Sequence, residues 1–219
     1  MINKVLMKLR PVAHGYDPVG PTGAERYAEA ECSNINLALV DDLARRLGGF
    51  AGKRILDLGA GPGQFSVEFA RRGASVTWHD PSRNYLAVAR DKAAACGADL
   101  DFRLGYLEEA AQYLDQPFDL VFNRICWYYC ADDGEFAELV HGLIRPGGAA
   151  YIDNFINRAP GGFNPRYWLN AIAGLKIGHV VPPPGRVERL FLSFGDMDLE
   201  MIHRSERSER LFLTRRAAP

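Results

Sequence analysis

The sequence predicts an α/β protein built on a doubly wound, mostly parallel sheet. Between residues 54 and 152, short apolar segments alternate with amphipathic helical ones, the pattern of βαβ units with parallel strands. Near the end of the chain, residues 199–205 and 210–215 are two further strand-like segments separated by a short polar turn. This arrangement predicts an antiparallel hairpin, so that the parallel sheet ends with one reversed strand.

Length and composition favour a single folded domain with a small elaboration. The chain has 219 residues, of which 47% are hydrophobic and 24% charged. We expect a helical cap at 1–49, a core at 50–156, a covering segment at 157–195 and a hairpin at 196–219. The formal net charge of −1 argues against a strongly basic nucleic-acid-binding protein.

No targeting, membrane or metal signal stands out. No apolar run approaches the roughly 18 residues of a membrane span, and the first ten residues alternate too quickly for a secretory signal. We therefore expect a cytoplasmic protein without a membrane partner. The four cysteines form no Cys-x-x-Cys pair and no zinc-like spacing with histidines, which predicts reduced packing residues and no metal site.

Periodicity and breakers predict the individual elements. Thr22 and Glu25 have capping-box spacing, which predicts a helix beginning at Thr22, and a second helix is expected over residues 36–47, ended by Gly48 and Gly49. The remaining expected helices are 64–72, 85–96, 133–143 and 165–175, and the expected parallel strands are 54–58, 75–79, 100–104, 118–123 and 149–152.

A glycine-rich turn after the first strand is the most informative motif. Glycines at 59, 61 and 63 follow a strand and precede a helix, and Asp80 ends the next strand. Ligands of α/β sheets bind at this edge, where glycine lets the backbone approach them and the helix presents free N–H groups. Asp80 suits the hydroxyls of a ribose, because an ionised carboxylate accepts two hydrogen bonds from a diol.

The residues flanking the turn favour a ligand that carries an ammonium group over a dinucleotide. A dinucleotide site has glycine or alanine at the sixth position of its motif, where this chain has Gln64. Asp57, just before the turn, would repel a pyrophosphate and attract an ammonium group.

The chain resembles the class I S-adenosylmethionine-dependent methyltransferases. Residues 55–63, Ile-Leu-Asp-Leu-Gly-Ala-Gly-Pro-Gly, are similar to the first motif of that superfamily, and His79-Asp80 to its acidic second-strand end. Residues 118–122 and 143–148 resemble its fourth strand and the turn before its fifth, and the final hairpin matches as well. The resemblance implies a seven-stranded Rossmann-like methyltransferase fold and S-adenosyl-L-methionine as cofactor.

The resemblance also implies roles for residues at matching positions. Gly59, Ala60 and Gly61 would line the methionine part of the cofactor, and Asp57 would face its amino group. Asp80 would hold the ribose diol. The other implied cofactor contacts are Tyr27, Pro81, Ser82, Asn123 and Arg124.

The chain departs from the family pattern after the third strand. Where members often have Gly-Asp-Ala, it has Gly105-Tyr106-Leu107, which puts the usual adenine contact in doubt. Tyr106 would then stack on the adenine, Glu108 would accept from its amino group, and the Leu107 N–H would reach its edge.

Candidate substrate residues follow the fourth strand and lie in the covering segment. Trp127, Tyr128 and Tyr129 suit the walls of a dry methyl-transfer site, with packing on a helix face as the alternative. His179 and His14 are candidate general bases, although proximity alone drives many methyl transfers. Arg166 is a candidate for binding a substrate anion, with a solvated loop arginine as the alternative.

The leading hypothesis is a small-molecule methyltransferase that transfers the methyl group in line. Alternatives are a methyltransferase of RNA or protein, favoured by the local surplus of arginine in the hairpin, and a cofactor-binding regulator without activity. A nicotinamide dehydrogenase is disfavoured by Asp57 and Gln64. The sequence leaves the substrate, the accepting atom and the oligomeric state open.

Overall fold

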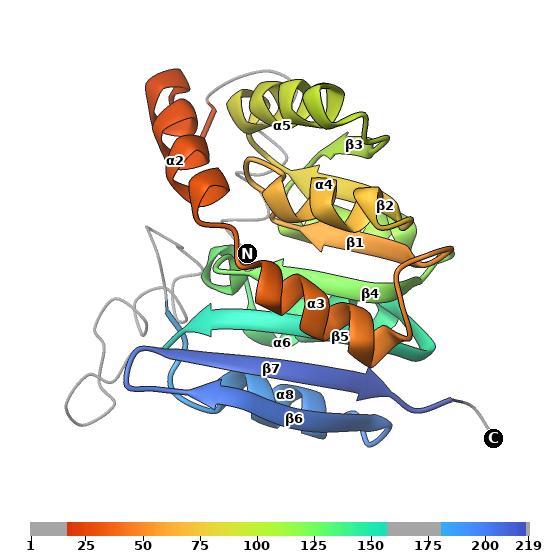
Figure 1. Cartoon of the computed structure of the whole chain (residues 1–219). Helices are drawn as coiled ribbons and strands as arrows, with labels where there is room; N and C mark the ends of the chain where they lie inside the picture. The colour runs from red at the N-terminus through yellow and green to blue at the C-terminus, as the bar shows by residue number, and fades with distance from the viewer. Residues whose placement is uncertain (1–16, 157–180, 218–219) are drawn as a thin grey trace. The chain divides into compact units, whose positions relative to one another are not determined.

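The computed structural model describes residues 17–156 and 181–217 and confirms the predicted fold class (Figure 1). Seven strands follow the order β3-β2-β1-β4-β5-β7-β6. Strand β7 runs antiparallel to both of its neighbours, as predicted for the hairpin, and the pairs β1–β2, β2–β3 and β4–β5 are parallel. The described residues divide into two compact units, one ending at Tyr106 and one beginning at Leu107.

The first unit contains three parallel strands and four helices. Strand β2 pairs with β1 on one side and with β3 on the other. The elements, in chain order, are α2 (Pro21–Ser33), α3 (Leu37–Leu47), β1 (Arg54–Leu58), α4 (Gln64–Arg71), β2 (Ser75–Asp80), α5 (Arg83–Cys96) and β3 (Asp101–Leu104).

The helix ends of this unit agree with the predicted caps for α3 but not for α2. The Asn36 side chain accepts a hydrogen bond from the Leu39 N–H, and Gly48 adopts a left-handed conformation at the end of α3, as predicted. The predicted capping box of α2 is wrong. The helix begins one residue earlier, because Pro21, which has no N–H to satisfy, occupies its first turn behind Gly20.

The second unit contains the hairpin and most of the large aromatic core. Its elements are η1 (Leu107–Tyr113), β4 (Phe118–Arg124), η2 (Trp127–Tyr129), α6 (Asp133–Leu143), β5 (Ile144–Phe155), α8 (Arg186–Leu192), β6 (Met197–Arg204) and β7 (Ser208–Arg215). Phe122 and Tyr151 are partners in the β4–β5 register and stack with ring centroids 5.3 Å apart. Trp127 packs against Phe136 of α6 and Phe191 of α8.

Strand β5 is longer than predicted. It was expected to begin at Ala149, after the Pro-Gly-Gly turn, but it begins at Ile144 and includes that turn as an irregularity in its pairing with β4. The register jumps from Phe118↔Ile144 to Leu120↔Ala149, as a bulge requires. At its other end the strand continues to Phe155, which carries polar residues to the carboxyl edge of the sheet.

The four cysteines are free, and two of them pack as expected. Cys126 and Cys130 are buried, whereas Cys96 is exposed at the end of α5, so the packing prediction is wrong for Cys96. In the described ranges, no helix is long and apolar enough to cross a membrane. The helix predicted over residues 165–175 lies outside the described residues.

Candidate functional site

The glycine turn (residues 59–63) is tied to the end of strand β2. The backbone N–H groups of Gly59 and Ala60 both donate to the carbonyl oxygen of His79, at 2.8 and 3.2 Å. The Gly61 N–H donates to Oδ2 of Asp80 at 3.0 Å. The turn and the acidic end of β2 therefore form one hydrogen-bonded unit.

The last glycine of the turn allows α4 to begin close to its neighbours. Gly63 has a φ of +76°, and a Cβ atom built on it would lie 2.9 Å from the Cβ of Ala89 and 3.4 Å from the Trp78 ring. Both the backbone conformation and the space therefore require glycine. In dinucleotide-binding motifs the glycine that allows close helix–strand packing is the sixth residue of the motif. Here Gly63, the fifth residue, has that function, so Gln64 at the sixth position is not required for this packing.

Trp78 of β2 contacts the glycine turn through both a hydrogen bond and ring packing. Its indole Nε1–H donates to the carbonyl oxygen of Gly61 at 3.0 Å, and its fully buried ring packs with Ala60 and Ala89. A buried indole donor needs such a partner, and here the partner is the backbone of the glycine turn. Sequence reasoning treated Trp78 as a strand residue only.

Asp80 is buried and strongly perturbed. Its Oδ1 accepts from the Ser82 N–H at 2.9 Å and its Oδ2 from the Gly61 N–H. Burial raises the pKa of Asp80 to about 6, since the two backbone hydrogen bonds only partly offset desolvation and the charge of Asp17 adds repulsion. Each carboxylate oxygen keeps lone-pair capacity for one more donor, which fits the predicted contact with a diol.

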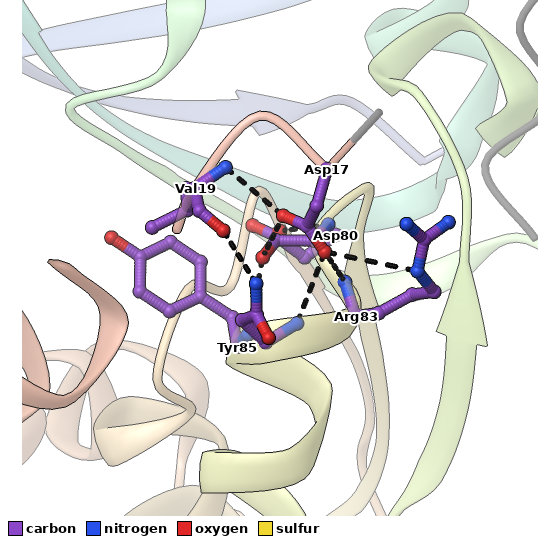
Figure 2. A network of polar contacts seen from close by, with 7 residues as sticks. Asp17, Val19, Asp80, Arg83 and Tyr85 are labelled. Atoms are coloured by element: carbon purple, nitrogen blue, oxygen red, sulfur yellow. Dashed lines mark hydrogen bonds and ion pairs between the residues drawn. The ribbon is translucent and has the colours of Figure 1, made fainter. Parts of the chain in front are cut away.

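Asp17, which the sequence analysis did not single out, closes the N-terminus of α5 (Figure 2). Its Oδ2 accepts from the backbone N–H groups of Arg83 and Asn84, at 2.7 and 3.2 Å, and its Oδ1 accepts from the Ser82 hydroxyl at 2.8 Å. Ser82 Oγ in turn accepts from the N–H of Tyr85. The first-turn donors of α5 are thus satisfied by a segment that lies 65 residues earlier in the chain.

The electrostatics of Asp17 follow from these donors. Burial alone would raise the pKa of Asp17, but hydrogen bonds from Val19, Ser82, Asn84 and Arg83 outweigh it and hold that pKa below its ordinary value. The positive end of the helix adds to the same effect. Asp17 therefore stabilises the fold in its ionised form.

We expect Asp17→Ala to lower the free energy of unfolding by about 1–2 kcal/mol at neutral pH, as loss of a helix cap does. The difference should shrink as pH falls through the lowered pKa of Asp17, because protonation removes the charge in the wild type too. Urea denaturation at several pH values measures both. Asp91→Ala, on the exposed side of α5, is the matched control and should have little effect.

Acceptor groups surround the turn. Asp57 is buried and its Oδ2 accepts from the Ser66 hydroxyl at 2.5 Å. Glu31 of α2 lies 3.4 Å from Nε2 of Gln64, while the buried Oε1 of Gln64 has no hydrogen-bond partner among the described residues. A diphosphate offers acceptors only, whereas an ammonium group or a diol offers donors. This set of oxygens fits a donor-rich cationic ligand.

The other residues predicted for the cofactor in this unit lie around the same edge. The Tyr27 ring is partly exposed and tilts against that of Tyr85, with centroids 5.9 Å apart. Pro81 is half-buried beside Asp80. The carbonyl oxygen of Tyr106 accepts from His79 Nε2 at 2.8 Å, which gives His79 a structural role. The cofactor contacts of these residues remain predictions.

In the second unit, the residues after β4 separate into packed and exposed positions. Trp127 is fully buried and its Nε1–H donates to Asp133 at 3.0 Å, which favours the packing alternative for this residue. Tyr128 is buried, whereas Tyr129 is half exposed. Asn123 is buried and donates from Nδ2 to the sulfur of Cys126.

Two further predicted positions in this unit have partners within it. Arg124 forms an ion pair with Asp153 at 3.6 Å. Leu107 is buried at the start of η1, and Glu108, next to it, accepts from the Ala131 N–H.

Three predicted residues, His14, Arg166 and His179, lie outside the described residues. Within the described ranges, no group of three or more His, Cys, Asp or Glu side chains could hold a metal ion. Four hairpin arginines have carboxylate partners within the chain: Arg204 pairs with Glu188 and Glu209, and the others are Arg210 with Asp153, Arg215 with Asp196 and Arg216 with Asp198.

Comparison with known proteins decides the family. A methyltransferase domain model matches residues 55–148. The ubiquinone biosynthesis O-methyltransferase of Sodalis glossinidius is 31% identical over 177 residues, which cover 75% of this chain and 69% of the relative. The chain belongs to the class I S-adenosylmethionine-dependent methyltransferases.

Other comparisons agree with this methyltransferase family. The ubiquinone biosynthesis O-methyltransferase of Aeromonas salmonicida is 34% identical over 151 residues, or 69% of this chain. The chain spans 61% of that relative's length. A solved O-methyltransferase family protein from Burkholderia thailandensis has a TM-score of 0.66 at 18% identity, covering 90% of this chain and 60% of its own, which supports the fold.

The candidate site contains two side chains, Asp17 and Trp78, that the sequence did not point to. The family assignment and the hydrogen-bond acceptors around the glycine turn both argue against a dinucleotide as the ligand. Asp17 carried no recognisable signal, because its role depends on a contact with residues 65 to 67 positions later. Trp78 could have been suspected, since a tryptophan two residues before Asp80 places both side chains on the same face of β2.

Proposed function

We propose that this chain is a small-molecule O-methyltransferase that uses S-adenosylmethionine. The proposal is supported by the hydrogen-bond acceptors that lie around the glycine turn. These are the carboxylates of Asp57 and Asp80 and the Oε1 atom of Gln64, which has no hydrogen-bond partner among the described residues. The relatives named as O-methyltransferases support oxygen as the accepting atom. The ion pairs of Arg204, Arg215 and Arg216 within the chain argue against the RNA alternative.

The chain's own residues suit this cofactor. Asp80 would accept from the ribose hydroxyls while its backbone donors hold it in place. Asp57 and Gln64 Oε1 would accept from the ammonium group, and the backbone of residues 59–61 would lie along the methionine chain. The acidic surroundings would also favour the positive charge of the sulfonium.

Bound S-adenosylmethionine supplies an electrophilic methyl group. In the transfer, the sulfur–methyl bond breaks as an oxygen–methyl bond forms in line with it, the sulfonium becomes a neutral thioether, and the acceptor hydroxyl loses its proton to a base or to water. The protein's contribution is orientation and exclusion of water, since water would stabilise the charged ground state more than the transition state.

Incubation with methyl-labelled S-adenosylmethionine and a set of small phenols and alcohols tests the proposal, with mass spectrometry of the products. We expect label on at least one hydroxyl acceptor. Label on RNA or protein alone, or no label with any acceptor despite binding of the cofactor, would contradict it.

The raised pKa of Asp80 gives the cofactor site a pH dependence. Only the ionised carboxylate accepts from both hydroxyls of a diol, so affinity should increase with pH through about 6. Calorimetric titrations at pH 5 and 7 should differ by about tenfold, the ratio of the ionised fractions. Asp80→Asn should bind weakly at both pH values, and an unchanged pH dependence in that variant would assign the effect to another group.

A further inference from the structure

Two carboxylates from separate parts of the chain are hydrogen-bonded to one serine at the start of α5. The Ser82 N–H donates to Oδ1 of Asp80 at 2.9 Å, and the Ser82 hydroxyl donates to Oδ1 of Asp17 at 2.8 Å. Asp80 is the last residue of β2, whereas Asp17 precedes α2 (Figure 2). Ser82 therefore links the carboxylate predicted to hold the ribose to the segment that precedes α2.

The Ser82 hydroxyl has two partners within the protein. Ser82 is fully buried, and its Oγ accepts from the Tyr85 N–H at 3.1 Å. A hydroxyl has a single proton, and that of Ser82 is donated to Asp17. The oxygens of Asp80 therefore keep lone pairs beyond those that accept from the N–H groups of Ser82 and Gly61. A diol needs these remaining lone pairs.

Asp17 is itself held by several donors. Its Oδ2 accepts from the N–H groups of Arg83 and Asn84, and its Oδ1 also accepts from the Val19 N–H at 2.9 Å. The Asn84 side chain donates from Nδ2 to the Val19 carbonyl oxygen at 2.6 Å. Residues 17–19 and the first turn of α5 thus hold each other by hydrogen bonds in both directions, which makes Asp17 a fixed acceptor for the Ser82 hydroxyl.

The segment that carries Asp17 continues into α2, which reaches the glycine turn. The Tyr27 ring of α2 contacts the Tyr85 ring of α5, and Oε2 of Glu31 on α2 lies 3.4 Å from Nε2 of Gln64. Gln64 is the first residue of α4, directly after the glycine turn. The hydrogen bonds of Asp17 therefore fix a part of the chain that belongs to the same candidate site.

Asp17 also acts on Asp80 through its charge. Burial is the main cause of the raised pKa of Asp80, and repulsion from Asp17 adds to it. Among the described residues, the charge of Asp17 is the one that contributes to this pKa, so its removal should lower the pKa of Asp80. The end of β2 and the elements around it carry further ionisable side chains, which include Glu31 (α2), Asp57 (β1), Glu68 (α4), His79 (β2), Arg83 (α5) and Arg103 (β3).

We propose that Asp17 is a positioning residue of the cofactor site, which acts through Ser82 to hold the Asp80 carboxylate in the orientation that receives the ribose diol. This inference rests on the proposed function, since that function assigns Asp80 to the ribose. Asp17 keeps the Ser82 N–H on Oδ1 of Asp80 and keeps the Ser82 hydroxyl proton away from it. The lone pairs that the diol needs therefore stay open, and the ligand finds its acceptor already oriented.

Titration calorimetry of the full chain with S-adenosylhomocysteine between pH 5 and 8 tests this role. We expect Asp17→Ala to weaken binding about tenfold at pH 7.5, because residues in one hydrogen-bond network are energetically coupled. The midpoint of the pH dependence should also move to lower pH, since Asp80 loses a repulsive neighbour and stays ionised in more acidic solution. Asp17→Asn keeps an oxygen for the Ser82 hydroxyl, so it should retain most of the affinity and show the same shift of the midpoint.

Asn36→Ala is the matched control for loss of a helix cap. The Asn36 side chain accepts from the Leu39 N–H at 3.0 Å at the start of α3, in the same unit, and none of its hydrogen bonds in the described ranges is to Asp80 or Ser82. Its removal should lower the stability by a similar amount and leave the affinity and the midpoint unchanged. In an Asp80→Asn background, Asp17→Ala should change the affinity by less than about twofold, because the carboxylate through which it acts is gone.

Circular dichroism confirms that every variant is folded. Wild-type affinity and an unchanged midpoint in Asp17→Ala, or an equal loss of affinity in Asn36→Ala, would overturn the inference and leave Asp17 as a helix cap alone. A full effect of Asp17→Ala in the Asp80→Asn background would overturn it as well. Absence of S-adenosylhomocysteine binding by the folded wild-type chain would instead count against the proposed function, so the two failures are distinguishable.

Discussion

Asp80→Ala is expected to weaken binding of S-adenosylmethionine about a hundredfold, since two hydrogen bonds to a charged acceptor contribute about 3 kcal/mol together. The carboxylate lies at the end of β2, within 3.0 Å of the Gly61 N–H, where a ribose next to the glycine turn would meet it. Its removal also leaves the N–H groups of Gly61 and Ser82 without their acceptor. Isothermal titration calorimetry at pH 7.5, roughly one and a half units above the pKa of Asp80, measures the loss with the carboxylate ionised.

Two further variants make the Asp80 result specific. Asp101→Ala removes a carboxylate that is exposed on β3 of the same unit and should not alter affinity. Asp80→Asn keeps one acceptor oxygen for the turn and should preserve folding while losing most of the affinity. An Asp80→Asn protein that binds as tightly as the wild type would show that the diol is held elsewhere.

Gly63→Ala is expected to lower the free energy of unfolding by about 2–5 kcal/mol. A left-handed residue other than glycine costs about 1–2 kcal/mol, and overpacking of a tight contact costs about 1–3 kcal/mol. The added Cβ would lie 2.9 Å from Ala89 and 3.4 Å from Trp78, so α4 or α5 would have to shift. Urea denaturation followed by circular dichroism measures the change.

Gly97→Ala separates the two contributions to this loss. Gly97 also has a positive φ, +62°, but no atom lies within 4 Å of its added Cβ. Gly97→Ala should therefore lower the free energy of unfolding only by the cost of the left-handed backbone conformation, about 1 kcal/mol. Equal losses in the two variants would contradict the inference that close packing against Ala89 and Trp78 requires glycine at position 63.

Much of the fold follows from short-range patterns in the sequence. The helices α3 and α6 and the strand β1 have the expected bounds to within one residue, because capping residues and apolar runs fix them locally. The start of α2 and the length of β5 were not predicted. Helix α2 begins at Pro21 and not at the expected capping box. Strand β5 is longer because it pairs with β4 on both sides of a bulge.

The candidate site was predictable where its residues are close in sequence. The glycine turn, Asp57 and Asp80 come from a single strand–turn–helix segment and the next strand end. Asp17 and Arg124 depend on partners far along the chain, Asp17 on the start of α5 and Arg124 on Asp153 of β5, which no local pattern encodes. Trp127 was placed with the substrate residues, but the aromatic side chains of α6 and α8 enclose it.

The proposed function requires that the acceptor-rich glycine turn bind a cationic aminoacyl nucleoside. Calorimetric titration of the wild-type chain with S-adenosylmethionine and, separately, with NAD tests it most directly. We expect saturable binding of S-adenosylmethionine at micromolar concentrations, with a binding free energy of order −8 kcal/mol, and no binding of NAD. Tight binding of NAD, or no binding of S-adenosylmethionine by the folded protein, would contradict it.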